Sequence, residues 1–232
     1  MARTAGVWTA AVVVLAATLA RAAAPLLIED WAQLSPGAKG IPAGWTRYET
    51  PGGRPAYDFT VVEDAGRRAL LLRSHDEHST IAKEIRVDLH ATPVLEWSWK
   101  IVALPTGADI RHKATSDLTA HVFVIWPRFP AMLRSRLIGY VWEESLPVGT
   151  VVTSRKSGAV RFLVVRSGTQ ELSQWLTDRR NVLEDYRRIF GEEPEDPRAI
   201  GLSIDTNDTH SGAETLFGRI GFLPAAAGAA SR

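Results

Sequence analysis

Short segments in which apolar and polar residues alternate, separated by Gly, Pro, Asp and Asn, are the strongest constraint on the fold of this chain. In residues 95–101, LEWSWKI, one alternate set is entirely apolar and the other is Glu, Ser and Lys. Successive side chains of a strand point to opposite faces, so this pattern predicts a strand with one buried face. Nine segments of strand length are found: Ala56 to Glu63, Ala69 to Ser74, Thr80 to Val87, Val94 to Val102, Leu118 to Trp126, Leu137 to Trp142, Val160 to Ser167, Ala199 to Asp205 and Thr215 to Phe222. Their number and spacing favour an all-β, jelly-roll-like sandwich of two sheets.

One inserted helix is predicted near residues 181–190, between the seventh and eighth of these strands. Asn181 with Glu184 three residues later forms a capping box, and apolar residues follow at helical spacing. Gly191 is placed to end the helix.

The first 22 residues have the layout of a secretory signal peptide. A basic start precedes an apolar run from Val7 to Leu19, and Ala20-Arg21-Ala22 supplies the small residues of a cleavage site. The run is too short for a membrane-spanning helix, which needs roughly 20 residues. The alternative is a buried amino-terminal helix. We expect a signal peptide over residues 1–22, a single domain over residues 23–224 and a frayed tail over residues 225–232.

The net charge and the cysteine content indicate which binding partners and which cellular compartment to expect. Without residues 1–22 the 27 basic residues lose Arg3 and Arg21, which leaves 25 against 26 acidic residues and a net charge of −1. Such a balance argues against a nucleic-acid partner. The chain has no cysteine, so it forms no disulfide, and an exported protein of this kind suits a bacterial periplasm. No later apolar run reaches membrane-spanning length, so we expect no membrane span after cleavage.

Polar residues of several strands are predicted to lie on a common face. This row comprises Glu96, Lys100, Asp117, His121, Tyr140, Arg161 and Asp205. One interpretation is a solvated outer sheet. The other is a ligand-binding face on which such groups hydrogen-bond the hydroxyls of a carbohydrate.

A dense run of oxygen-bearing side chains ends the eighth strand. Asp205, Asn207 and Asp208 are hard ligands of the type that calcium prefers. The run lacks the glycine and the terminal glutamate of an EF-hand loop. Asp and Asn also form tight turns by capping neighbouring backbone groups, which is the alternative.

Two further groups of charged residues are candidate chemical sites. Glu143-Glu144 resembles the paired carboxylates of glycosidases, but neighbours on a strand face opposite sides, so a catalytic partner such as Asp117 or Asp205 is needed. His75-Asp76-Glu77-His78 contains four potential metal ligands, yet its position at a hairpin favours a solvated turn.

Seven motifs in order resemble a bacterial family of exported proteins catalogued only as a domain of unknown function. They are Leu95-Glu96-Trp97-Ser98-Trp99-Lys100, Asp117 before an apolar strand, Tyr140-Val141-Trp142, Leu146-Pro147-Val148-Gly149-Thr150, Val164-Val165-Arg166-Ser167-Gly168, Arg179-Arg180-Asn181-Val182 and Asp205-Thr206-Asn207-Asp208-Thr209. The resemblance implies export and a single domain. It implies no activity and designates no catalytic residues.

Three functional hypotheses follow. The first is a periplasmic or secreted sandwich that binds a polar ligand, in particular a carbohydrate, without converting it and without a cofactor other than calcium. The second is a glycan hydrolase or lyase that uses Glu96 or Glu143 with Asp117 or Asp205. The third is a structural or interaction protein of the cell envelope.

Overall fold

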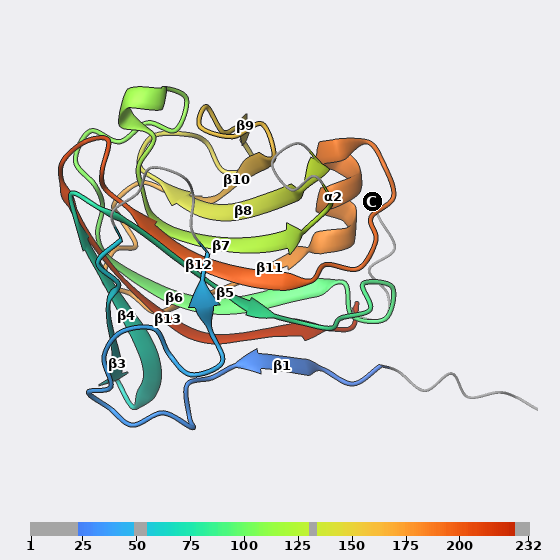
Figure 1. Cartoon of the computed structure of the whole chain (residues 1–232), viewed down its shortest axis with the longest axis horizontal. Helices are drawn as coiled ribbons and strands as arrows, with labels where there is room; N and C mark the ends of the chain where they lie inside the picture. The colour runs from blue at the N-terminus through green and yellow to red at the C-terminus, as the bar shows by residue number, and fades with distance from the viewer. Residues whose placement is uncertain (1–22, 49–54, 130–133, 226–232) are drawn as a thin grey trace, which may run out of the picture.

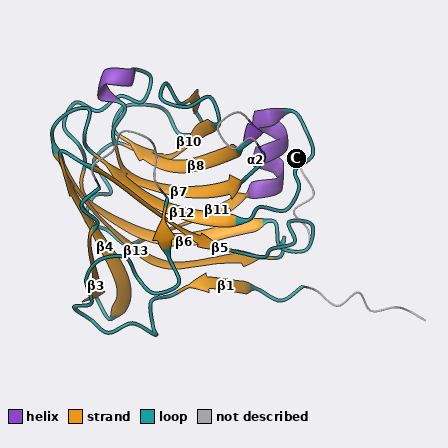
Figure 2. Cartoon of the chain, in the orientation of Figure 1, coloured by secondary structure: helices purple, strands orange, loops and turns teal. Residues whose placement is uncertain are grey.

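The computed structural model describes residues 23–48, 55–129 and 134–225, and these form two β-sheets packed face to face (Figures 1 and 2). The expected signal peptide, residues 1–22, and residues 226–232 of the expected tail lie outside the described residues. Within the described ranges, no helix has the length and apolar character needed to cross a membrane.

The first sheet, called sheet A, has six strands. Five lie in the order β11-β6-β13-β4-β3, and β1 pairs with β13. Their bounds are Leu26–Glu29 for β1, Asp58–Asp64 for β3, Arg67–His75 for β4, Val94–Ala103 for β6, Leu176–Asn181 for β11 and Gly212–Leu223 for β13.

The second sheet, called sheet B, has seven strands in the order β2-β5-β12-β7-β8-β10-β9. Their bounds are Thr46–Arg47 for β2, His78–Glu84 for β5, Leu118–Trp126 for β7, Arg136–Glu143 for β8, Val151–Thr153 for β9, Val160–Ser167 for β10 and Ala199–Asp205 for β12. A short 3-10 helix, η1 (Lys113–Thr115), precedes β7. All described pairings are antiparallel except that of β8 with β10.

Aromatic side chains fill the space between the sheets. Trp97 and Trp99 of β6 are completely buried and pack edge to face. Trp97 stacks on Tyr140 of β8, with ring centroids 5.3 Å apart. These contacts join sheet A to sheet B, and they confirm that the apolar alternate set of residues 95–101 faces the core.

The single α-helix of the described residues, α2 (Val182–Phe190), covers one end of the sandwich (Figure 1). The Asn181 side chain accepts a hydrogen bond from the Glu184 N–H, and Gly191 ends the helix with a left-handed φ of 70°. Burial of Tyr186 against Trp126 anchors the helix to sheet B. The predicted helix is therefore confirmed at both ends.

All nine predicted strands are present, and the predicted all-β sandwich is confirmed. The prediction omitted β1, β2, β9 and β11. Three of these contain only two to four residues, which is too short for a clear alternation. β11 alternates weakly because Asp178, Arg179 and Arg180 lie in its middle.

Candidate ligand-binding face

The surface of sheet B that points away from sheet A is the candidate site, and we call it the outer face of sheet B. In β12, Ile200, Leu202 and Ile204 point into the core, so Ser203 and Asp205 lie on the outer face. In β5 the residues of this face are His78, Thr80 and Ala82, and β7 adds His121, Phe123 and Ile125. The strand alternation thus brings titratable groups and aromatic rings onto one surface.

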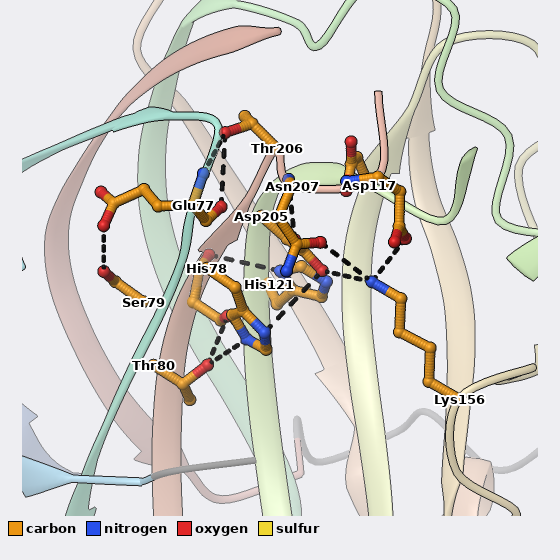
Figure 3. Close-up of polar contacts among 12 residues, drawn as sticks. Glu77, His78, Ser79, Thr80, Asp117, His121, Lys156, Asp205, Thr206 and Asn207 are labelled. Carbon is orange, nitrogen blue, oxygen red and sulfur yellow. Dashed lines mark hydrogen bonds and ion pairs between the residues drawn. The ribbon is translucent and has the colours of Figure 1, made fainter. Parts of the chain in front are cut away.

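A lysine ammonium group lies among the three side chains predicted to bind calcium. Lys156, in the loop between β9 and β10, places its Nζ atom 3.1 Å from Asp205 Oδ2 and 2.5 Å from Asp208 Oδ2. The same atom donates a hydrogen bond of 3.4 Å to Asn207 Oδ1. Figure 3 shows the lysine side chain reaching across the strand end to Asp205. The predicted oxygen cluster exists, and in this structure its counter-charge is Lys156.

Asp117 holds the loop that carries Asn207 and Asp208. Its Oδ1 accepts the N–H of Asp208 at 3.1 Å. Its Oδ2 accepts both the N–H and the hydroxyl of Thr209, at 2.7 and 2.6 Å. Asp117 is fully buried, and these hydrogen bonds from the loop satisfy its carboxylate. The turn-capping alternative is represented by the Asn207 N–H, which donates to Asp205 Oδ1 at 3.4 Å.

A chain of hydrogen bonds runs beside Asp205. The Thr80 and Ser203 hydroxyls are 2.6 Å apart, and both contact His78 Nε2, at 2.8 and 3.3 Å. His78 Nδ1 lies 4.0 Å from Asp205 Oδ2. His121 Nδ1 lies 3.3 Å from the Ser203 carbonyl oxygen. The two imidazoles and the carboxyl group therefore form one connected cluster (Figure 3).

Burial controls the charges in this cluster. It lowers the pKa of His78 to about 4, aided by the positive charge of Lys156. It also lowers the pKa of His121 to about 3, aided by His78. Burial raises the pKa of Asp205 to about 7, against the opposing effect of Lys156. Burial lowers the pKa of Lys156, but Asp205 and Asp208 outweigh it and leave that pKa above its usual value. At neutral pH both histidines are uncharged and the lysine is charged.

Aromatic rings continue the face from this cluster. The rings of His121 and Phe123 stack with centroids 5.1 Å apart, and Phe162 lies 5.5 Å from His121. Gly139 makes this packing possible, since a Cβ atom there would lie 2.8 Å from the Phe123 ring.

A hollow of about 710 Å³ lies at the other end of the same face, over β2, β5, β12 and β7. Ala82, Ile85, Ile125, Pro127 and Ala199 supply its apolar lining. Its other lining residues are Thr46, Tyr48, Glu84, Arg86 and Arg198. The register places it at the far end of the strands from Asp205, because Ala199 pairs with Glu84 and Asp205 with His78.

The predicted single polar row is wrong, because its residues lie on three different surfaces. Glu96 and Lys100 lie on the outer face of sheet A, where they pair with Arg179 and Asp64. In β6 the predicted alternation is correct, but alternation does not tell which sheet a strand joins.

Tyr140 and Arg161 also lie away from the outer face of sheet B. Tyr140 is in the core and donates a hydrogen bond of 3.1 Å to Asp185 Oδ2. Arg161 pairs with Ile138, an inward-facing position, and stacks over the Phe190 ring of α2. Of the predicted ligand-binding residues, the structure brings together Asp117, His121 and Asp205.

The run His75-Asp76-Glu77-His78 lies where β4 of sheet A connects to β5 of sheet B, so the predicted hairpin is wrong, and the run is only partly solvated. Asp76 is exposed and lies 2.6 Å from the His210 ring. Glu77 is buried, and its carboxylate contacts the Ala56 N–H and the Ser79 hydroxyl. His78 belongs to the polar cluster described above. No group of three or more potential metal-binding His, Asp or Glu residues is found within the described ranges.

Sequence reasoning missed His78, Lys156, Arg86 and Arg198 as residues of this face. The predicted third strand began at Thr80. Extending its alternation by two residues would have placed His78 beside Thr80. No local pattern connects Lys156 to Asp205, which is 49 positions later.

Comparison with known proteins agrees with the family resemblance. The model of a family described as "Protein of unknown function (DUF3047)" matches residues 43–221. The chain belongs to the DUF3047 family. No curated protein matches the chain significantly.

Solved structures with a similar fold come from other families. A family 11 carbohydrate-binding module of a Clostridium thermocellum cellulase has a TM-score of 0.46 at 9% identity, covering 88% of this chain and 97% of the module. The xyloglucanase domain of an effector from Sinorhizobium fredii has a TM-score of 0.43 at 11% identity, with 82% and 99% covered. A family 30 carbohydrate-binding module of C. thermocellum has a TM-score of 0.43 at 12% identity, with 82% and 96% covered. These likenesses concern the sandwich fold alone.

Proposed function

We propose that this DUF3047 protein binds a carbohydrate on the outer face of sheet B without converting it. The hollow of about 710 Å³ carries the proposal, because small-molecule sites have volumes of roughly 300–1,000 Å³ and combine apolar walls with a few polar groups. Tyr48 is half-buried at its wall and offers a ring and a hydroxyl. Glu84, Arg86 and Arg198 are exposed there and offer an acceptor and two donor groups for sugar hydroxyls.

Binding without conversion is favoured by the way the nearby carboxylates are used. Asp117 is occupied by the backbone of its loop, and Asp205 contacts Lys156. Neither carboxylate lines the hollow.

The test is a screen of the full chain against immobilised glycans, followed by titration calorimetry with each glycan that binds. Ala199→Trp places a large side chain in the hollow and should reduce affinity at least tenfold. Val62→Trp places the same side chain in a smaller hollow on sheet A and should leave affinity unchanged. Equal affinities for the two variants would contradict the proposal.

Glycan cleavage is the second candidate, and a specific pair of groups favours it. Asp205 has a raised pKa of about 7, as a general acid requires. Glu143 is buried with no hydrogen-bond partner for its Oε1 atom, while its Oε2 accepts the N–H groups of Ser145 and Leu146. One strand separates β8 from β12, which places the two carboxyl groups on the order of 10 Å apart. That spacing is near the upper limit for inverting glycosidases.

Product analysis separates the two candidates. A glycan that binds should be recovered intact after prolonged incubation. If it is cleaved, and Glu143→Gln abolishes cleavage without abolishing binding, the second candidate is the correct one.

Export of the protein belongs to the same proposal, with residues 1–22 as the signal peptide and the bacterial periplasm or exterior as the compartment. The basic start, the apolar run and the Ala-Arg-Ala sequence support it. Intact-mass measurement on the protein from its native cells should show the loss of about 22 residues. A full-length cytoplasmic form would contradict export.

A further inference from the structure

Three charged side chains line the hollow on sheet B, and none of them has a charged partner among the described residues. Arg86, Arg198 and Glu84 make no side-chain hydrogen bond or ion pair within the described part of the chain. Elsewhere most arginines are paired, such as Arg73 with Glu214 and Arg166 with Asp178. The hollow therefore has two guanidinium groups whose donors are used by no side chain of the described residues.

We propose that the ligand of this hollow is a saccharide that carries a carboxylate, such as a uronic acid unit. This inference rests on the proposed carbohydrate-binding function and assigns its ligand class. A guanidinium binds a carboxylate through two parallel N–H···O bonds, which is the strongest and most specific pairing open to it.

The charge balance of the hollow selects a singly charged group. Among the described lining residues, Arg86 and Arg198 against Glu84 give a net charge of +1. One sugar carboxylate neutralises this charge. A second negative charge would be placed near Glu84, whose carboxylate is instead suited to accept hydrogen bonds from sugar hydroxyls.

The apolar part of the hollow fits the rest of a sugar ring. Ala82, Ile125 and Ala199 offer small or aliphatic surface beside the charged groups. Tyr48 adds an aromatic ring whose hydroxyl has a pKa raised by burial, so it stays a neutral hydrogen-bond donor at neutral pH. The arrangement combines a non-polar contact for ring C–H groups with charged contacts for the substituents.

Polygalacturonate oligomers test the proposal, because the same backbone is obtained with free or methyl-esterified carboxyl groups. In calorimetric titration of the full chain, the free-acid oligomer should bind at least tenfold more tightly than the fully esterified one. Its affinity should fall as salt is raised. Monomeric galacturonate distinguishes a single bound sugar from a chain. Similar affinity for monomer and oligomer assigns one uronate to the hollow, and tighter binding of the oligomer assigns more than one. Either result supports a carboxylate-bearing ligand.

Variants locate the binding site. Arg86→Gln and Arg198→Gln should each weaken binding of the free acid about tenfold and leave binding of the ester nearly unchanged. Arg219→Gln removes an exposed positive charge on sheet A and should have no effect. Equal losses in all three variants would indicate non-specific attraction and overturn the inference.

The outcomes distinguish failure of the carboxylate assignment from failure of the proposed carbohydrate binding. Equal affinity for acid and ester, or binding of neutral glycans alone, overturns the carboxylate assignment and leaves carbohydrate binding standing. Binding of no glycan of either kind by a correctly folded chain, with a cooperative thermal transition, overturns both.

Discussion

Lys156 Nζ lies 3.1 Å from Asp205 Oδ2, although the two residues are 49 positions apart in the chain. The side chain of Asp205 is only 6% exposed, whereas that of Lys156 is 31% exposed. The ammonium group thus links the loop before β10 to the end of β12 and offsets the cost of burying the carboxyl group.

Removing this ammonium group should make Asp205 harder to ionise. Burial already raises the pKa of Asp205 to about 7 against the opposing effect of Lys156. In Lys156→Met the pKa of Asp205, followed by carbon-13 NMR, should rise further. Lys113→Met, at an exposed lysine of η1, should leave it unchanged. A fall in the pKa of Asp205 in Lys156→Met would contradict this account.

Calcium and Lys156 should compete for the same oxygens. Asp205, Asn207 and Asp208 all contact the lysine ammonium, so a cation can enter only if the ammonium leaves. Calcium should therefore raise the melting temperature of Lys156→Met more than that of the unmodified protein. A ligand that binds only the folded state adds about 2.7 kcal/mol at a hundredfold excess over Kd. Adding Asp208→Asn to the variant should remove the gain, and indifference of Lys156→Met to calcium would leave the oxygens with a turn-forming role alone.

Acidification should destabilise the protein through its two buried histidines. Their pKa values in the folded state, about 4 for His78 and about 3 for His121, lie below the usual value of about 6.5. At pH values between about 4 and about 6.5 the unfolded chain binds more protons at the two histidines than the folded chain does. Stability therefore falls as the pH falls through this range. Asp205 acts in the opposite direction between about pH 7 and 4, because its folded-state pKa is raised.

The two histidines bind two more protons in the unfolded chain, and Asp205 binds one more in the folded chain, so the net difference is one proton. The free energy of unfolding should therefore fall by about 1.4 kcal/mol for each pH unit of acidification. Urea unfolding at pH 4.5 and 6.5 measures this slope. With both histidines replaced, His78→Gln and His121→Gln, the contribution of Asp205 remains and the loss on acidification should shrink or reverse. An unchanged slope would show that these histidines do not control it.

Truncation of a core tryptophan should be far more damaging than a change on the adjacent outer position. Trp97 is completely buried and stacks on Tyr140, so Trp97→Ala should cost roughly 3–5 kcal/mol of unfolding free energy. Ser98→Ala, on the opposite face of the same strand, should cost less than about 1 kcal/mol. Urea unfolding of the two variants checks the assignment of the faces, and similar small losses would contradict it.

The fold was largely predictable because it depends on local patterns. The alternation in residues 95–101 identified a strand and its buried face, and Asn181 with Gly191 identified both ends of α2. These signals lie within one segment, so they need no knowledge of which segments meet.

The site was less predictable because it depends on strand order. The strands that contain Glu96 and Asp205 show a similar alternation of polar and apolar side chains, yet these strands, β6 and β12, belong to different sheets. Arg86 and Arg198 come together only because Ala199 pairs with Glu84. Long-range pairing of this kind leaves no mark in the local sequence around either arginine.

The central claim is that the outer face of sheet B binds a carbohydrate, and calorimetric titration of the full chain against Ala199→Trp tests it most directly. The unmodified chain should bind at least one glycan, Ala199→Trp should lose at least tenfold in affinity, and Val62→Trp should bind as the unmodified chain does. Full affinity in Ala199→Trp, with loss in Val62→Trp, would contradict the claim and move the binding site to sheet A.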